Sequence, residues 1–160
     1  MTNFTDIKVK RGGAKKAGIT VRFVKDWPAK EIIELYEAGG WWDDSADDAS
    51  LVKKIISGSF VFAVAVNEET GRAMGMGRAL SDGASDAYIQ DVVVLPEYRR
   101  EGIGEKLINA IRDYCLSKKI KWIALVAEPG TEEFYSSLGF RVMAGHTPMR
   151  YMGIEQGNGK

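Results

Sequence analysis

The chain has 160 residues, 45% of them hydrophobic and 28% charged, and its formal net charge is zero, as is ordinary for a soluble globular domain. A single cysteine, Cys115, excludes an internal disulfide, and a single histidine, His146, leaves little for a zinc site or a Ser-His-Asp triad. The longest apolar run is too short to cross a bilayer and the N-terminus lacks a signal-peptide stretch, so we expect a cytoplasmic protein with no metal and no membrane partner.

The first 16 residues carry five basic side chains against one aspartate. Such an arm can contact nucleic acid or can be a mobile, solubilising tail. Five dispersed charges make a weak patch, so we expect no nucleic-acid partner. The predicted organisation is a flexible basic tail at 1–18, one folded domain at 19–153 and a flexible tail at 154–160.

Hydrophobic periodicity predicts the elements in chain order. Alternation predicts a strand at 19–24, and a helix then begins near Pro28 and ends at Gly39 and Gly40. A loop with two tryptophans and four aspartates leads to a short helix at 49–57. The elements expected after it are strands 60–66 and 73–80 as a hairpin, strand 87–95, helix 104–118, strand 122–126, helix 131–138 and two closing strands in 140–143 and 149–152.

This order is an antiparallel meander that becomes a strand–helix–strand crossover. Sequential hairpins pair as antiparallel neighbours, whereas a crossover through a helix makes its two strands parallel. The sequence therefore predicts an α+β fold in three layers, with a central mixed, mostly antiparallel sheet and helices on both faces.

The most informative stretch runs from Val92 to Leu107, where a strand leads through a turn with two glycines directly into a helix. Glycine lets the backbone adopt φ > 0 and lets an anion approach its N–H groups. The helix N-terminus adds unpaired donors and a partial positive charge, and Arg99 and Arg100 add full charges. The stretch predicts a pyrophosphate site. A Rossmann fingerprint fits worse because Leu107 stands in place of its third glycine, and the Gly-Lys-Ser/Thr of a Walker A loop is missing.

The longer pattern Arg99-Arg100-Glu101-Gly102-Ile103-Gly104 resembles the acetyl-CoA motif of the GNAT superfamily of N-acetyltransferases. The resemblance extends over residues 19–152 and implies the GNAT-like fold with acetyl-CoA as cosubstrate. It also implies that the preceding strand pairs with the pantetheine arm and that the Val92 amide holds the thioester oxygen. The implied cofactor residues are Val92, Val93, Val94, Arg99, Arg100, Glu101, Gly102, Ile103, Gly104 and Glu105.

A second stretch, from Phe134 to Phe140, resembles the Tyr-x-x-x-Gly-Phe signature of the family, whose tyrosine lies near the CoA sulfur. The resemblance makes Tyr135 the candidate general acid; the alternative is a core aromatic residue on a short helix. Many members carry, seven residues earlier, an asparagine that contacts the pantetheine, and this chain has Glu128 there. A carboxylate accepts an amide N–H but cannot donate one, so Glu128 departs from the pattern while remaining a candidate cofactor contact.

Asp91 is the candidate base, because it lies one residue before the valines at the edge of the central strand. The alternative is a structural aspartate that bonds to the local backbone. Strict alternation puts Asp91 on the face opposite Val92 and puts Tyr88 and Gln90 on the same face as Val92, where they would line the acceptor channel.

Family members build the acceptor pocket between the first two helices, where this chain has Trp41, Trp42 and Asp43. Aromatic walls and carboxylates suit a cationic amine with an apolar or aromatic body. The competing interpretation is that Ser45, Asp47 or Asp48 caps the next helix.

The stretches around Arg78, Asp91 and Tyr135 are similar to GNAT members of bacteria, archaea and plants called serotonin N-acetyltransferase-like, which act on arylalkylamines. The predicted function is transfer of acetyl from acetyl-CoA to a primary amine, such as an arylalkylamine or another small amine. The alternatives are a non-catalytic acyl-CoA-binding module and a protein lysine or N-terminal acetyltransferase. Closing strands commonly form a dimer edge in this superfamily, so a homodimer is one state to test.

Overall fold

The structure is a computed structural model that describes residues 18–45 and 48–152. The predicted basic tail 1–18, apart from Gly18, lies outside the described residues, as do Asp47 and the predicted tail 154–160.

The elements follow the predicted order up to α4, and their ends differ from the predicted ones by at most one residue. Gly39 and Gly40 end the first helix as expected, and Gly40 has a φ of 73°. The bounds are β1 (Ile19–Phe23), α1 (Ala29–Ala38), α2 (Ala49–Gly58), β2 (Val61–Asn67), β3 (Ala73–Ser81), β4 (Asp86–Val94), the 3-10 turn η1 (Pro96–Tyr98), α3 (Ile103–Ser117), β5 (Trp122–Leu125) and α4 (Glu132–Ser137).

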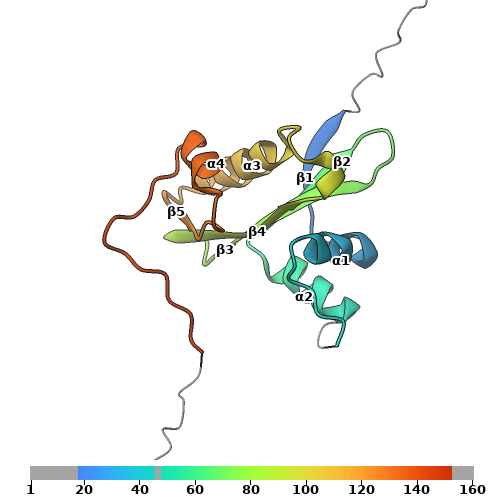
Figure 1. Cartoon of the computed structure of the whole chain (residues 1–160), viewed down its shortest axis with the longest axis horizontal. Coiled ribbons are helices and arrows are strands. Elements are labelled where there is room, and N and C mark those ends of the chain that lie inside the picture. Colours follow the sequence, from blue (N-terminus) through green and yellow to red (C-terminus); the bar gives the residue numbers. More distant parts are fainter. Residues whose placement is uncertain (1–17, 46–47, 153–160) are drawn as a thin grey trace, which may run out of the picture.

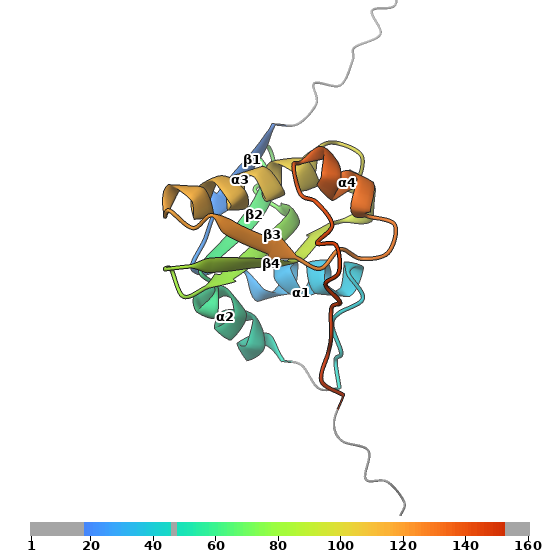
Figure 2. The ribbon, with the colours of Figure 1, turned by 90° about the vertical axis from the view of Figure 1, so that its left-hand side faces the viewer.

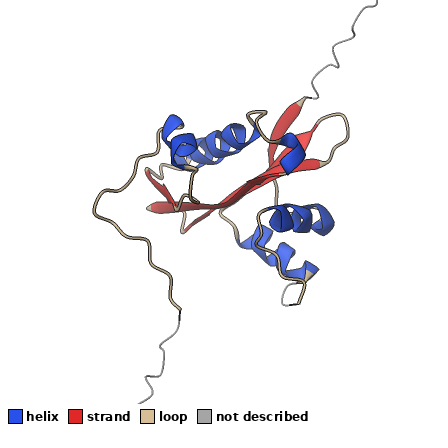
Figure 3. Ribbon diagram, viewed as in Figure 1, coloured by secondary structure: helices blue, strands red, loops and turns tan. Residues whose placement is uncertain are grey.

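The strands form one sheet in the order β1-β2-β3-β4-β5, in which the β4–β5 pair is parallel and the other pairs are antiparallel. Helices α3 and α4 lie on one face of the sheet, and α1 and α2 lie on the other (Figures 1 and 3). The predicted α+β, three-layer architecture with a mixed, mostly antiparallel sheet is confirmed.

The sheet separates two apolar clusters because successive strand residues point to opposite faces. Along β2, Val61, Ala63 and Ala65 pack with the buried side of α3. Their neighbours Phe62, Val64 and Val66 pack with α1 and α2. All seven residues of β2 are buried, so this strand is the centre of the core.

The alternation breaks in β4, which contains a β-bulge at Asp91. Met76 of β3 pairs with Val93 and Arg78 pairs with Gln90, so one β3 residue, Gly77, faces two β4 residues. Asp91 has a φ of 55°, a left-handed conformation that aspartate tolerates better than most residues. The bulge puts Val92 on the α3 face together with Ile89.

This bulge corrects one prediction. Tyr88 pairs with Leu80 and Gln90 pairs with Arg78, both on the face opposite Ile89, so Tyr88 and Gln90 do not share the face of Val92. The prediction was wrong because a bulge shifts the side-chain phase by one residue, and strict alternation holds only for a regular strand.

The two closing strands are absent from the described chain. Residues 140–152 run from α4 along the side of the domain without strand pairing (Figure 2). Met149 and Tyr151 remain 93% and 81% exposed. The prediction was wrong because strand-forming side chains need a hydrogen-bonded neighbour, and no residue of this segment pairs with the open edge of β5.

None of the helices in the described ranges is long and apolar enough to span a bilayer.

Candidate functional site

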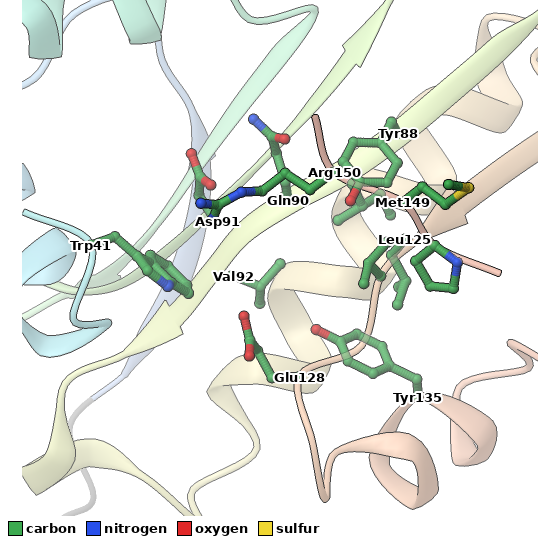
Figure 4. A pocket seen from close by; sticks show the side chains of 13 residues that line it. Trp41, Tyr88, Gln90, Asp91, Val92, Leu125, Glu128, Tyr135, Met149 and Arg150 are labelled. Atoms are coloured by element: carbon green, nitrogen blue, oxygen red, sulfur yellow. The ribbon is translucent and has the colours of Figure 1, made fainter. Parts of the chain in front are cut away.

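The candidate site is a pocket at the point where β4 and β5 separate. Their pairing stops at Ile89 and Leu125, and beyond it the edge of β4 that faces β5 has no partner strand in the described chain. The pocket in this opening has a volume of about 450 Å³. Seven predicted site residues line it, and they come from four parts of the chain: Trp41, Tyr88, Gln90, Asp91, Val92, Glu128 and Tyr135 (Figure 4).

The loop from β4 to α3 has the geometry expected of an anion site. Arg100 and Gly102 both have positive φ, 65° and 78°, and Gly102 is the N-cap of α3. Because glycine has no side chain, no side-chain oxygen caps this helix, and the backbone N–H groups of its first turn remain available to a ligand. Arg99 folds back, and its Nε donates to the Val94 carbonyl at 3.0 Å.

Gly104 lets α4 pack closely against the start of α3. A Cβ at Gly104 would lie 3.3 Å from Cζ of Phe134, a contact that tolerates little more bulk. Phe134 in turn stacks edge-on against Tyr135, with ring centroids 5.0 Å apart. The second glycine of the motif therefore helps to set the position of Tyr135.

Asp91 is held from two sides on the α1 face of the sheet. The Tyr36 hydroxyl donates to Oδ2 of Asp91 at 2.7 Å, and Nε of Arg78 donates to the same oxygen at 2.6 Å. Tyr36 is only 5% exposed, and burial together with the Asp91 charge raises its pKa, so it remains a neutral donor. These bonds fix the carboxylate at the bulge, where a left-handed backbone needs support.

Tyr135 and Glu128 lie together on the other side of Val92 (Figure 4). Tyr135 stands on α4, and Glu128 lies in the loop between β5 and α4. Burial raises the pKa of Tyr135, and the nearby Glu128 charge raises it further. The phenol therefore keeps its proton throughout the neutral range and can act as a donor.

The loop after α1, here called the acceptor loop, contains three predicted acceptor residues, Trp41, Trp42 and Asp43, and these lie in different surroundings. Trp41 is 40% exposed and lines the pocket, whereas Trp42 packs beside Tyr36, and its indole N–H donates to Asp44 at 2.9 Å. Asp43 does not line the pocket. Its Oδ1 accepts from the backbone N–H of Ser45 at 2.9 Å and from the Ser45 hydroxyl at 2.6 Å, which lowers the pKa of Asp43.

Asp48 caps α2, with its carboxylate accepting from the backbone amides of Ser50 and Leu51. The capping interpretation of the acidic loop is therefore confirmed for Asp48, whereas acceptor binding by Asp43 stays a prediction.

Other residues at the site escaped prediction from the sequence. Tyr36 is one of three buried residues of α1, and Arg78 stands out in the sequence only through a family resemblance. Met149 and Arg150, which also line the pocket, were assigned to a closing strand. No local pattern marks them, because they reach the pocket through the path of the chain after α4.

Within residues 18–45 and 48–152, no group of three or more histidine, cysteine, aspartate or glutamate side chains is arranged to hold a metal ion.

Comparison with known families agrees with the motif. The sequence profile of the acetyltransferase (GNAT) domain matches residues 58–142, which include β2 to α4 and both glycines of the phosphate loop.

Two curated relatives illustrate the range of similarity. The "Uncharacterized N-acetyltransferase ycf52" of Gracilaria tenuistipitata var. liui is 36% identical over 112 residues, covering 69% of this chain and 60% of that protein. The "Histone acetyltransferase TAP1" of Glycine max is 43% identical over 72 residues, covering 45% of this chain and 31% of that protein. The chain spans less than two thirds of the length of the curated relatives it matches.

A GNAT family acetyltransferase from Streptococcus pneumoniae TIGR4 superposes on the structure with a TM-score of 0.71 and 26% identity, covering 86% of this chain and all of that one. The neighbour AAC(6')-Iy, solved in complex with a bisubstrate analogue that contains CoA, has a TM-score of 0.67 at 17% identity, covering 84% of this chain and 99% of that one. The latter likeness extends to the fold alone.

Proposed function

The chain belongs to the GNAT acetyltransferase family, and we propose that it transfers the acetyl group of acetyl-CoA to a primary amine. The observation that supports this most directly is the opening between β4 and β5. Val92, Glu128 and Tyr135 surround one pocket there, and the uncapped N-terminus of α3 follows the same strand.

Acetyl-CoA would bind along the free edge of β4. The pyrophosphate would accept hydrogen bonds from the amides at the start of α3, next to Arg100 and Gly102. The pantetheine arm would then follow Val94, Val93 and Val92, where no neighbouring strand competes for the backbone. This path ends at the pocket, with the thioester oxygen at the Val92 amide.

The acceptor must lose a proton before it attacks. An alkyl ammonium with a pKa of about 10.4 is only about 0.04% free amine at pH 7, a cost of about 4.6 kcal/mol. Two carboxylates line the pocket, and Oδ2 of Asp91 is already engaged by Arg78 and Tyr36. Among described contacts the Glu128 carboxylate has no ion pair or hydrogen bond, so we propose Glu128 as the base, directly or through water.

Tyr135 would act as the general acid. The amine nitrogen forms a bond to the acetyl carbon and releases its surplus proton to water, the carbon–sulfur bond breaks, and the phenol gives its proton to the departing thiolate. The raised pKa of Tyr135 keeps the proton in place before the step, and solvent restores it afterwards. Glu128 would thus accept a proton from the amine, and Tyr135 would donate a proton to the CoA thiolate.

The acceptor body would lie against Trp41 and Tyr88. Both side chains line the pocket, and aromatic surfaces favour an amine with an aromatic or apolar body, such as an arylalkylamine. Because the Glycine max relative is named a histone acetyltransferase, a protein lysine is the second candidate acceptor.

The test is turnover of acetyl-CoA with a panel of arylalkylamines, polyamines and lysine peptides, measured as the release of CoA. Acetyl-CoA should raise the thermal stability of the protein, because it binds only the folded state, and should do so more than ATP or NADH. A non-catalytic acyl-CoA-binding module would show the stabilisation but no turnover. Stabilisation by ATP or NADH and not by acetyl-CoA would reject the proposal altogether.

We also propose that the chain forms a homodimer through β5. The outer edge of β5 has no partner strand in the described chain, and Trp122 on this strand is 53% exposed. Unpaired backbone groups and exposed apolar surface favour strand pairing with a second copy. Light scattering after gel filtration should give twice the chain mass, and Trp122→Lys should give the monomer mass; a monomeric wild type would contradict the proposal.

A further inference from the structure

Arg150 places a positive charge in the acceptor pocket. It is the one basic residue among the described residues that line this pocket, and it belongs to the segment after α4. In Figure 4 its side chain lies on the side of the pocket with Gln90 and Asp91, whereas Glu128 and Tyr135 lie on the other side. The two ends of the pocket therefore differ in charge.

The guanidinium of Arg150 has most of its hydrogen-bonding capacity unused. Its Nε contacts the sulfur of Met152 at 3.1 Å, which is a weak acceptor. None of the three ion pairs in the described part of the chain includes Arg150. An arginine carries five N–H donors in a planar fork that matches a carboxylate or a phosphate. The four donors other than Nε–H can therefore bind an anion.

The charge balance of the pocket argues against a simple cationic acceptor. Asp91 is already neutralised by Arg78, so Glu128 and Arg150 are the charges left to interact with a ligand. A ligand with only an ammonium group would bind beside Glu128 but would be repelled by Arg150. A ligand with an ammonium at one end and an anionic group at the other satisfies both.

We propose that the acceptor carries an anionic group, a carboxylate or a phosphate, in addition to its primary amine, and that Arg150 binds this group. The inference rests on the proposed acetyltransferase function and refines its substrate class. The amine would lie between Glu128 and Tyr135 next to the thioester, and the anionic group would lie across the pocket from them. Arg150 is then a residue that determines specificity and takes no part in the proton transfers.

The test compares matched pairs of acceptors that differ in an anionic group placed away from the amine: phenethylamine with 4-(2-aminoethyl)benzoate, and ethanolamine with O-phosphoethanolamine. Each is measured for kcat/KM with acetyl-CoA, and for thermal stabilisation of the CoA-bound protein, in wild type, Arg150→Gln and Arg141→Gln. Arg141 lies on the same segment but does not line this pocket, so its substitution is a control for the loss of one charge.

We expect the anionic member of at least one pair to be preferred by wild type and by Arg141→Gln. Arg150→Gln should lower its kcat/KM about tenfold, mainly through KM, and should improve kcat/KM for the simple amine, because the repulsion by Arg150 is removed. The carboxylate and phosphate pairs identify which anion is bound.

Two results would overturn the inference: a preference for the simple amine in both pairs, or an anion preference that Arg150→Gln leaves intact. The proposed function can hold in both cases, because amines are still acetylated. If no amine is turned over, the proposed function fails instead, and the stabilisation measurements on Arg150→Gln still decide whether Arg150 binds the anion.

Discussion

The residues expected to bind the cofactor stand on β4, α3 and the turn between them, whereas those expected to bind the acceptor stand largely on two loops. The cofactor side packs on the apolar cluster between α3 and the sheet, in which Leu107 and Ile108 are fully buried. The acceptor side combines Trp41, on a loop after α1, with the exposed segment that contains Arg150. A rigid side suits a ligand common to a whole family, and loops can change with the acceptor.

The largest effect is expected on the cofactor side, from Gly102→Glu. The side chain would add a negative charge and bulk where the pyrophosphate binds, so affinity for acetyl-CoA should fall by more than about 100-fold. Gly102→Gln is the control, because both variants pay the same cost of about 1–2 kcal/mol for a left-handed backbone. Calorimetric titration of both variants separates the two contributions; equal affinities would mean that the anion is not bound at this turn.

The next-largest effect is expected at the two carboxylates of the pocket, where a substitution of Glu128 should lower kcat more than a substitution of Asp91. Glu128→Gln removes the proposed base and should lower kcat by about 10²–10⁴-fold. Asp91→Asn keeps a residue that accepts the left-handed conformation and loses only the pairing with Arg78, so its effect on kcat should be about tenfold or less. Steady-state kinetics at saturating acetyl-CoA measure both. A larger loss in Asp91→Asn would return the base to Asp91.

The sequence predicted the cofactor side better than the acceptor side for physical reasons. Two glycines between a strand and a helix can be identified locally, because their conformations depend on the turn itself. The bulge at Asp91 depends on its pairing with β3 and on Arg78 and Tyr36, which are distant in sequence. No pattern near Asp91 contains that information, so strict alternation placed Tyr88 and Gln90 on the wrong face.

The segment 140–152 shows the same limit in another form. Its apolar residues have the composition of strands, but composition does not supply a partner strand. Arg150 was therefore assigned to a closing strand, whereas it lines the pocket. The cytoplasmic location remains a prediction, since several relatives are named as chloroplastic proteins.

Within the acceptor loop, the neighbouring tryptophans should have separable effects. Trp41→Ala should raise the acceptor KM about fivefold, because the side chain lines the pocket, and should change acetyl-CoA affinity little. Trp42→Ala should mainly lower the melting temperature, because Trp42, unlike Trp41, packs against the apolar cluster formed with α1 and α2. Kinetics and thermal melts of both variants make the comparison, and a KM effect confined to Trp42→Ala would contradict the assignment.

The smallest effect is expected from Asp43→Asn. The Asp43 carboxylate turns the loop by accepting two hydrogen bonds from Ser45, and an asparagine oxygen can accept the same bonds. The acceptor KM should change less than about twofold. A rise of tenfold without loss of stability would restore Asp43 to the acceptor site.

The most direct measurement of the central claim is the pH–rate profile of Tyr135→Phe beside wild type, with Tyr151→Phe as a control because Tyr151 is 81% exposed and does not line the pocket. Burial and Glu128 raise the pKa of Tyr135, so wild type should lose activity through this group only above about pH 10. Tyr135→Phe should bind acetyl-CoA as wild type does, lower kcat by about 10²–10⁴-fold and lack that alkaline loss. A Tyr135→Phe variant with the kcat and profile of wild type would contradict the account.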